Sequence, residues 1–139
     1  MKVFLTGGTG YLGARLREGL LSAGHQVTVL SRAAREEGGE SRLRWVQGDL
    51  RDGPPPIEIL HQHRAVVHAA ALVKTWVRDR RDFDRVNVEA YDALLERCNR
   101  SGVPRIVHTS SFLSLGPTAE GRPMREQDRS PREEFLTDY

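Results

Sequence analysis

The stretch Thr6-Gly7-Gly8-Thr9-Gly10-Tyr11-Leu12-Gly13 decides the fold of this 139-residue chain. An apolar run at residues 2–6 precedes it, and leucines at helical spacing follow it. The glycines satisfy both G-x-G-x-x-G and G-x-x-G-x-x-G. In such turns one glycine permits a tight turn, another lets the backbone approach a pyrophosphate, and a third lets a helix pack closely on a sheet. Backbone N–H groups at the helix start would hold the phosphates. The residues expected to form this site are Gly7, Gly10, Tyr11, Leu12 and Gly13.

Strand-like and helix-like segments alternate along the chain from its first residues. Apolar runs predict strands at residues 2–6, 27–30, 43–46, 65–68 and 105–109. Amphipathic or capped segments predict helices at residues 11–23, 57–61 and 82–100, with another starting at 132–139. The alternation implies βαβ units and a parallel sheet, and right-handed crossovers favour the strand order 3-2-1-4-5. The sequence therefore predicts an α/β fold, a doubly wound parallel sheet of the Rossmann type.

The composition is that of an ordinary globular domain, with 38% hydrophobic and 29% charged residues. The net charge of +2 gives no indication of a nucleic-acid surface. Cys98 is the single cysteine and lies on the apolar face of its expected helix, so it is expected to pack in the core of a protein from a reducing compartment. The chain has no signal-peptide pattern and no apolar stretch long enough to span a membrane, which predicts a cytoplasmic protein without membrane contact.

The end of the second expected strand bears on which nucleotide is bound. NAD sites carry an acidic residue about 20 residues past the glycine motif, but this strand ends Val29-Leu30-Ser31-Arg32. Ser31 can form a hydrogen bond with a phosphate, and Arg32 can pair with a 2′-phosphate in a bidentate fork, with Arg35 assisting. Alternatively, Arg32 stacks on the adenine or points to solvent. The residues favour NADP, and NAD remains an alternative.

Further short motifs follow the glycine turn in a characteristic order. They are Gly48-Asp49-Leu50, His68-Ala69-Ala70-Ala71, Asn87-Val88 and Thr109-Ser110-Ser111. Together they resemble the extended short-chain dehydrogenase/reductases, the NAD-dependent epimerase/dehydratase family, over essentially the whole chain. Trp76 and the segment 83–89 resemble the dihydroflavonol-reductase and 3β-hydroxysteroid-dehydrogenase branch. Nucleotide-sugar epimerases share most of the same motifs.

The resemblance implies further cofactor contacts. Asp49 and Leu50 would contact the adenine, and the small residues Ala69, Ala70 and Ala71 would line the cofactor. Asn87 would support the strand ends near the cofactor, although it could also be a plain helix-surface amide. Thr109 would complete the cofactor site at the end of the fifth strand. Small residues after a parallel strand also leave room where ligands bind in open α/β sheets.

The resemblance also implies a catalytic Ser, Tyr and Lys, the last two spaced Tyr-x-x-x-Lys on one helix. By register Ser111 matches the serine that orients the carbonyl, with Ser110 as the alternative. Tyr139 matches the tyrosine that exchanges a proton with the substrate oxygen, although it could be a tyrosine that ends the sequence by chance. The lysine, which makes the phenol useful near neutral pH, would come four positions further on.

These motifs predict an NAD(P)-dependent reductase or dehydrogenase acting on a carbonyl or a secondary alcohol. A nucleotide-sugar epimerase or dehydratase with retained nicotinamide is the nearest alternative, and a non-catalytic NADP-sensing regulatory protein is an alternative of another class. Residues 1–139 are expected to form an incomplete NAD(P)-binding domain, lacking the later strands and a C-terminal substrate domain, and to be inactive alone. The expected partner is a small-molecule substrate, and a homodimer is compatible with the sequence.

Two other features are given ordinary explanations. His61-Gln62-His63 resembles a pair of metal ligands, but no Cys or carboxylate cluster accompanies it. We therefore expect a solvated helix end and no metal. The basic run at residues 78–81 is expected to be a solvated loop, with a contact to a phosphate-bearing substrate as the alternative.

Overall fold

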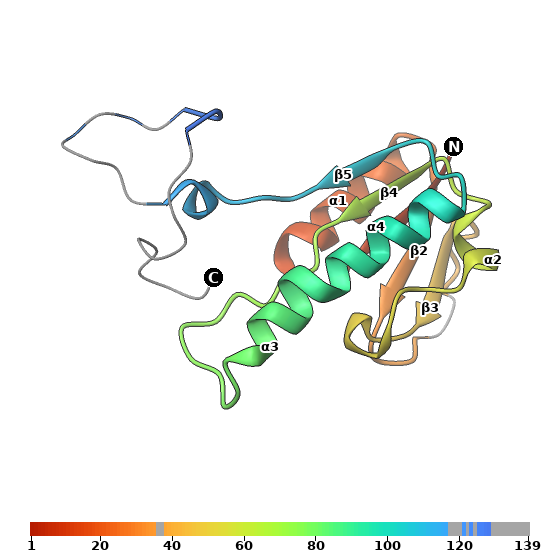
Figure 1. Ribbon diagram of the computed structural model, residues 1–139. Coiled ribbons are helices and arrows are strands. Elements are labelled where there is room, and N and C mark those ends of the chain that lie inside the picture. The colour runs from red at the N-terminus through yellow and green to blue at the C-terminus, as the bar shows by residue number, and fades with distance from the viewer. Residues whose placement is uncertain (36–37, 117–120, 122, 124, 129–139) are drawn as a thin grey trace.

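Five short strands form one parallel sheet in the computed structural model, which describes residues 1–35, 38–116, 121, 123 and 125–128. The strands are β1 (Lys2–Thr6), β2 (Gln26–Ser31), β3 (Leu43–Gln47), β4 (Ala65–His68) and β5 (Ile106–His108). Their order is β3-β2-β1-β4-β5, and every neighbouring pair is parallel. The Rossmann-type fold and the strand order predicted from the sequence are therefore confirmed (Figure 1).

Helices cover both faces of this sheet. The helix α1 (Tyr11–Ser22) lies behind the sheet in Figure 1, and α4 (Ala90–Arg100) crosses its front. The shorter elements are the α-helices α2 (Ile57–Leu60) and α3 (Arg81–Asp84), the 3-10 turns Leu50–Asp52 and Phe112–Leu115, and a π-helical segment, Arg85–Glu89. Within the described ranges, no helix is long and apolar enough to cross a membrane.

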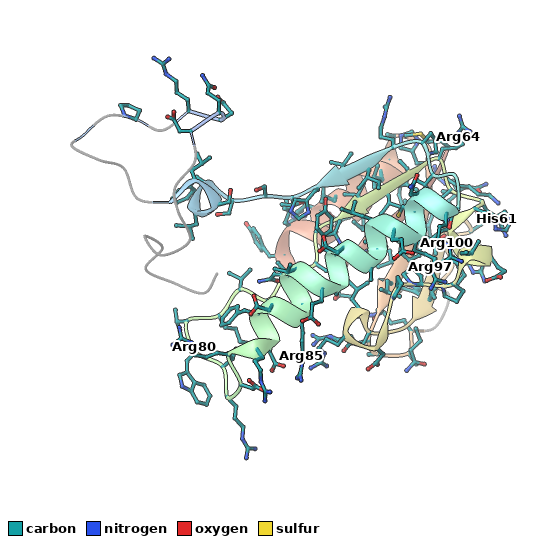
Figure 2. All side chains as sticks on the ribbon, in the orientation of Figure 1. His61, Arg64, Arg80, Arg85, Arg97 and Arg100 are labelled. Atoms are coloured by element: carbon teal, nitrogen blue, oxygen red, sulfur yellow. The ribbon has the colours of Figure 1, made fainter. Side chains whose placement is uncertain are left out.

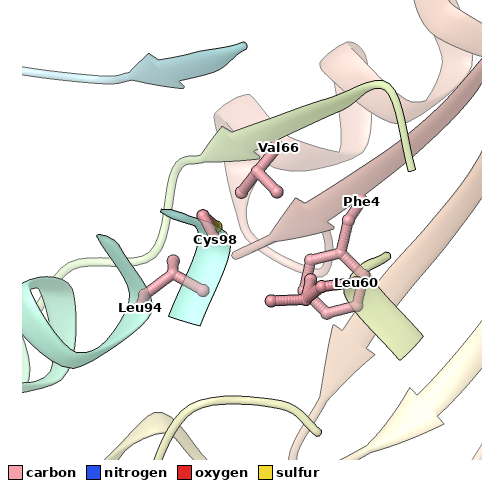
Figure 3. Packing of buried hydrophobic residues seen from close by; sticks show 5 residues of the cluster. All are labelled: Phe4, Leu60, Val66, Leu94 and Cys98. Carbon is pink, nitrogen blue, oxygen red and sulfur yellow. The ribbon is translucent and has the colours of Figure 1, made fainter. Parts of the chain in front are cut away.

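The core consists of two clusters, one on each face of the sheet, because successive side chains of a strand point to opposite sides. Phe4 of β1 packs on the α4 face in a cluster that is completed by Leu60, Val66, Leu94 and Cys98 (Figure 3). Leu5, the next residue, packs on the α1 face with Val27 and Val29. Cys98 is fully buried, as its position on the apolar face of the helix predicts.

The helix expected over residues 82–100 is interrupted by the π-helical segment Arg85–Glu89, which joins α3 to α4. Phe83, Leu94 and Cys98 are buried, so the predicted apolar face is present on both sides of the interruption. A π-helical turn contains one more residue than an α-helical turn, and such turns occur frequently at functional sites. Asn87 lies within this segment, and its contacts are described below.

The prediction of a solvated helix end at His61-Gln62-His63 is wrong for His63. His61 is exposed at the periphery (Figure 2), but His63 is only 7% exposed beneath the sheet. The Nδ1–H of His63 donates to the carbonyl of Ile59 at 2.7 Å, so Nε2 accepts from the hydroxyl of Thr28 at 2.9 Å. Burial lowers the pKa of His63 below its usual value. The ring is therefore a satisfied core group of the kind that buried polar side chains require.

The arginines at the end of α4 show how this helix is stabilised at its surface. Arg97 and Arg100 occupy the last helical turn, and Figure 2 labels them on the front of the molecule. Cations near the carboxyl end of a helix interact favourably with its dipole. Arg100 also pairs with Glu96 at 3.8 Å. These charges lie on α4 at the amino-terminal side of the sheet, away from the candidate site described next.

Candidate functional site

A hollow of about 380 Å³ opens at the carboxyl ends of the central strands. It lies between the glycine turn after β1, the end of β2, the loop after β3 and the loop after β4. Its lining includes most of the residues predicted from the sequence: Gly7, Gly10, Ser31, Arg32, Asp49, Leu50, Ala69, Ala70 and Ala71. Ligands of open α/β sheets bind in this position. The structure therefore brings together residues that are spread over about half of the chain.

Two of the turn's glycines are required by contacts with the protein itself. Gly7 has a φ of +71°, and a Cβ there would lie 2.5 Å from the backbone carbonyl carbon of Ala69. A Cβ on Gly13 would overlap the carbonyl oxygen of Gly7 and lie 2.7 Å from its carbonyl carbon. Gly10 is different, because only the Gly7 oxygen lies within 4 Å of its Cβ position, at 3.3 Å. Gly10 therefore presents bare backbone to the hollow.

The start of α1 leaves donors available beside Gly10. Gly10 is the N-cap in an extended conformation, and among the described residues no side chain caps this helix. The first backbone bond of the helix runs from the N–H of Ala14 to the carbonyl of Gly10, at 2.9 Å. The N–H groups of Tyr11, Leu12 and Gly13 precede it, where a helix has no internal acceptors. The side chains of Tyr11 and Leu12 are exposed, so their contribution to a phosphate site would come from their backbone.

The end of β2 differs from the expectation in part. Ser31 is buried, and its hydroxyl donates to the carbonyl of Ala33 at 2.9 Å, so the hydroxyl hydrogen holds the local turn. Arg32 is exposed and lines the hollow. Arg35, expected to assist Arg32, instead places its guanidinium 5.0 Å from the ring centroid of Trp45, on which Arg17 also lies at 5.5 Å. A cation over an indole is itself a favourable contact, which explains this position.

Asp49 presents a carboxylate to the wall of the hollow. It caps the turn Leu50–Asp52 by accepting the N–H of Arg51, at 3.0 Å. The Arg51 guanidinium also donates to it, at 2.7 Å for Nη2, and these bonds hold the pKa of Asp49 below its usual value. Leu50 beside it is buried. The pair thus combines an ionised acceptor with an apolar surface, a combination suited to an adenine edge and face.

Asn87 fixes the loop that follows the three alanines. Its side-chain oxygen accepts the N–H of Leu72 at 2.7 Å, and its amide nitrogen donates to the Leu72 carbonyl at 3.1 Å. The alternative of a helix-surface amide is therefore wrong. Because Ala69, Ala70 and Ala71 lie just before Leu72, this two-point attachment holds the wall of the hollow against the π-helical segment.

A buried polar pair lies directly behind the glycine turn. Thr6 and His68 are paired in register on β1 and β4 and are 0% and 2% exposed. Their side chains bond, with Oγ1 of Thr6 2.8 Å from Nδ1 of His68, and the N–H of Ala70 donates to the same Oγ1 at 3.4 Å. The His68 ring stacks on Tyr91, which stacks on His108. From the sequence, His68 was considered only as the first residue of the motif His68-Ala69-Ala70-Ala71. The signal that could have identified the pair is that a Thr and a His end two strands that the predicted order makes neighbours.

Burial lowers the pKa of His68 to about 4, with a smaller contribution from His108. An unfolded histidine titrates near pH 6.5, so folding favours the neutral ring. The stability that His68 contributes is complete above about pH 6.5 and is lost as the pH falls toward 4. We expect the free energy of unfolding of the full-length protein to fall by up to about 1.4 kcal/mol per pH unit more than that of His68→Asn in this range. Denaturant titrations of both proteins at pH 7.5 and pH 5 test this. An equal fall in the free energy of unfolding of the two proteins between these pH values would contradict it.

The catalytic candidates lie further from the hollow. The N–H of Thr109 donates to the carbonyl of His68 at 2.9 Å, which anchors the chain just after β5. Ser111 is half-buried, and its Oγ accepts the N–H of Leu113 at 3.2 Å as the cap of Phe112–Leu115. Neither Thr109 nor Ser111 lines the hollow. Tyr139 and the helix expected at 132–139 lie outside the described residues.

A second hollow of about 310 Å³ adjoins the first and shares Arg32, Asp49, Leu72 and Lys74 with it. Trp76, which is 75% exposed, also lines it. The sequence analysis assigned no role to Lys74. Arg81 of the basic run begins α3 and pairs with Asp79 at 3.0 Å, so that run is partly helical rather than a plain loop.

The parallel sheet, the glycine turn and the hollow together define a Rossmann-type dinucleotide-binding domain. The model of the NAD dependent epimerase/dehydratase family matches residues 3–138. The chain belongs to the NAD-dependent epimerase/dehydratase family, as the order of its motifs predicts.

The relatives of the chain include several kinds of enzyme. It is 36% identical over 142 residues to a protein named putative dihydroflavonol 4-reductase from Synechocystis sp., covering 98% of this chain and 40% of that protein. It is 35% identical to sterol demethylase protein B from Methylococcus capsulatus, covering 100% of this chain and 43% of that protein. The chain thus spans about two fifths of the length of these curated relatives.

Solved structures also resemble the chain, at somewhat lower sequence identity. MoeE5 in complex with UDP-glucose and NAD is 30% identical with a TM-score of 0.77, covering 94% of this chain and 43% of that chain. A UDP-glucose-4-epimerase from Stenotrophomonas maltophila with bound NAD is 26% identical, with the same TM-score and the same two coverages.

Proposed function

We propose that this chain is the cofactor-binding part of an NADP(H)-dependent reductase or dehydrogenase that acts on a carbonyl or a secondary alcohol. The observation that carries the proposal is the position of Arg32, which is exposed at the end of β2 and lines both hollows. NAD sites usually have a carboxylate at this place for the ribose 2′-hydroxyl. A guanidinium there suits a 2′-phosphate.

The described residues fit a dinucleotide in several respects. The bare backbone of Gly10 and the uncapped start of α1 suit the pyrophosphate. Asp49 and Leu50 suit the adenine, and the small side chains of Ala69, Ala70 and Ala71 leave room beside it. The bound cofactor would supply or accept a hydride. Asn87 would contribute to cofactor binding indirectly, because it holds the loop after Ala71 through the backbone of Leu72.

The proposed chemistry assigns two further side chains. The hydroxyl of Ser111 would orient the substrate carbonyl, once its bond to the Leu113 N–H is shared or exchanged. The phenol of Tyr139 would give a proton to the substrate oxygen or take one from it. A lysine four residues after Tyr139 would lower the phenol's pKa toward neutrality.

Arg32→Ala in the full-length protein should weaken NADPH binding far more than NADH binding. Loss of a charge-assisted bidentate phosphate pair costs about 1.5–3 kcal/mol, or roughly ten- to a hundredfold in Kd. NADH lacks the 2′-phosphate, so its Kd should change little. Calorimetric titration with both nucleotides measures the difference.

The matched control is Arg100→Ala, which removes the same charge from the last turn of α4, where Arg100 pairs with Glu96. It should leave both dissociation constants unchanged. If Arg32→Ala weakens NADPH and NADH equally, the 2′-phosphate assignment is wrong and NAD becomes the favoured cofactor.

A nucleotide-sugar epimerase or dehydratase is the second candidate, favoured by the likeness to MoeE5 in its complex with UDP-glucose and NAD. Such an enzyme reoxidises its own cofactor and retains it. Purified full-length protein that carries a stoichiometric nicotinamide would support this candidate, whereas nucleotide-free protein that consumes added NADPH would support the reductase. A gene without a lysine four positions after Tyr139 would instead favour a non-catalytic NADP-sensing protein.

A further inference from the structure

The hydrogen bond between Thr6 and His68 lies where two parts of the hollow meet. Thr6 is the last residue of β1 and precedes Gly7, while His68 is the last residue of β4 and precedes Ala69. Both following residues line the hollow. At this point the backbones of Gly7 and Ala69 also approach so closely that no Cβ fits on Gly7. The side-chain bond therefore connects the glycine turn to the loop of Ala69, Ala70 and Ala71 (the alanine loop) from the buried side, away from the hollow.

The donors and acceptors around Thr6 indicate the direction of this bond. Oγ1 of Thr6 already accepts the N–H of Ala70, at 3.4 Å. Its own hydroxyl hydrogen is then available for Nδ1 of His68 at 2.8 Å. A hydroxyl that accepts on one side and donates on the other satisfies both its functions in a buried setting. With that hydrogen directed at Nδ1, His68 accepts the bond and its ring proton lies on Nε2, which is the tautomer used in the proposal below.

The opposite side of the His68 ring is fixed by packing. Tyr91 of α4 stacks on it with a centroid distance of 4.9 Å, and His108 of β5 stacks on Tyr91 at 4.3 Å. The N–H of Thr109 additionally donates to the backbone carbonyl of His68. These contacts orient the ring, with Nδ1 at Thr6 and its face stacked on Tyr91 and on His108 of β5, the strand that Figure 1 shows beside β4.

We propose that His68 is a positioning residue of the nucleotide site, which holds the glycine turn and the alanine loop in register by accepting a hydrogen bond from Thr6. This inference rests on the proposed nucleotide-binding function. It assigns no contact between His68 and the nucleotide. Because the turn receives the part of the cofactor that NADH and NADPH share, the effect on the two nucleotides should be equal, unlike the effect of Arg32.

The test uses paired variants of the full-length protein. Thr6→Val removes the hydroxyl and keeps the shape, while Thr6→Ser keeps the hydroxyl. His68→Leu removes the acceptor, while His68→Asn keeps an amide oxygen near the position of Nδ1. Thr6→Val and His68→Leu should each weaken NADH and NADPH by the same factor, roughly three- to tenfold, the value of one hydrogen bond. Thr6→Ser and His68→Asn should restore most of the affinity.

Binding is measured well below the melting temperature of every variant, so that a loss of stability alone does not change Kd. Wild-type affinity in Thr6→Val, or a Thr6→Ser variant as weak as Thr6→Val, would overturn the inference while leaving the proposed function intact. A wild-type protein that binds neither nucleotide would overturn both. The ring nitrogens of the wild-type protein give a test that needs no variant: ¹⁵N shifts must show an unprotonated Nδ1 and a protonated Nε2 for His68, and the opposite tautomer would overturn the inference.

Discussion

Replacing Gly13 by alanine should remove nucleotide binding almost completely. The new Cβ would overlap the carbonyl oxygen of Gly7 and lie 2.8 Å from the Cα of Gly8, and all of these neighbours are backbone. Since no side chain can rotate away, either α1 or the glycine turn must move. We expect Kd for NADPH to rise at least about a hundredfold, equivalent to about 2.7 kcal/mol. The free energy of unfolding should also fall by about 1–3 kcal/mol.

Gly19→Ala is the matched control because Gly19 lies on the same helix with no atom within 4 Å of its Cβ position. Alanine is the better helix former, so this variant should gain about 0.5–1 kcal/mol of stability with Kd unchanged. Nucleotide titration and thermal unfolding of both variants measure these effects. Tight NADPH binding by Gly13→Ala would show that the helix start does not hold the phosphates.

Tyr139→Phe should lower kcat by about 10²–10⁴-fold in the full-length protein, because it removes the proposed proton donor and keeps the ring. The affinity for NADPH and the melting temperature should barely change. Steady-state kinetics with a carbonyl substrate, together with nucleotide titration, separate the two effects. The double variant with Ser111→Ala should be little worse than the worse single variant, since residues that act as a unit are not additive.

Tyr91→Phe provides the control for losing a phenol hydroxyl. Its ring stacks on both His68 and His108, and the stacking contacts do not use the hydroxyl. This variant should turn over normally. If Tyr139→Phe does so as well, the catalytic tyrosine lies further along the chain.

The fold could be predicted from the sequence because its main signals are local. Each strand is a short apolar run, α1 follows the glycine turn directly, and Gly24 ends the helix region with a φ of +81°. The parallel order then follows from crossover handedness. The hollow was also predictable in outline, since parallel strands deliver their carboxyl ends, with Arg32, Asp49 and Ala69, to one edge.

The remaining features depend on contacts between distant residues. Nothing near Arg35 in the sequence indicates that its guanidinium would form a cation–π contact with Trp45. The burial of His63 depends on Thr28, and the role of Asn87 depends on Leu72 and on a π-helical segment that apolar spacing does not reveal. The Thr6–His68 bond exists only because β1 and β4 are neighbours in the sheet. Such pairings require the three-dimensional register.

The placement of the two tryptophans gives the protein a built-in optical probe. Trp45 is covered by Arg17 and Arg35, whereas Trp76 is 75% exposed and lines the second hollow, which adjoins the one at the glycine turn. Reduced nicotinamide absorbs light at the wavelengths at which tryptophan emits, so an excited indole can transfer its energy to a bound nicotinamide. The efficiency of this transfer depends steeply on the distance between the two rings. Tryptophan emission can therefore follow occupancy of the hollows without any dye, with Trp76 lining one of them. Replacing either indole by phenylalanine assigns the two contributions.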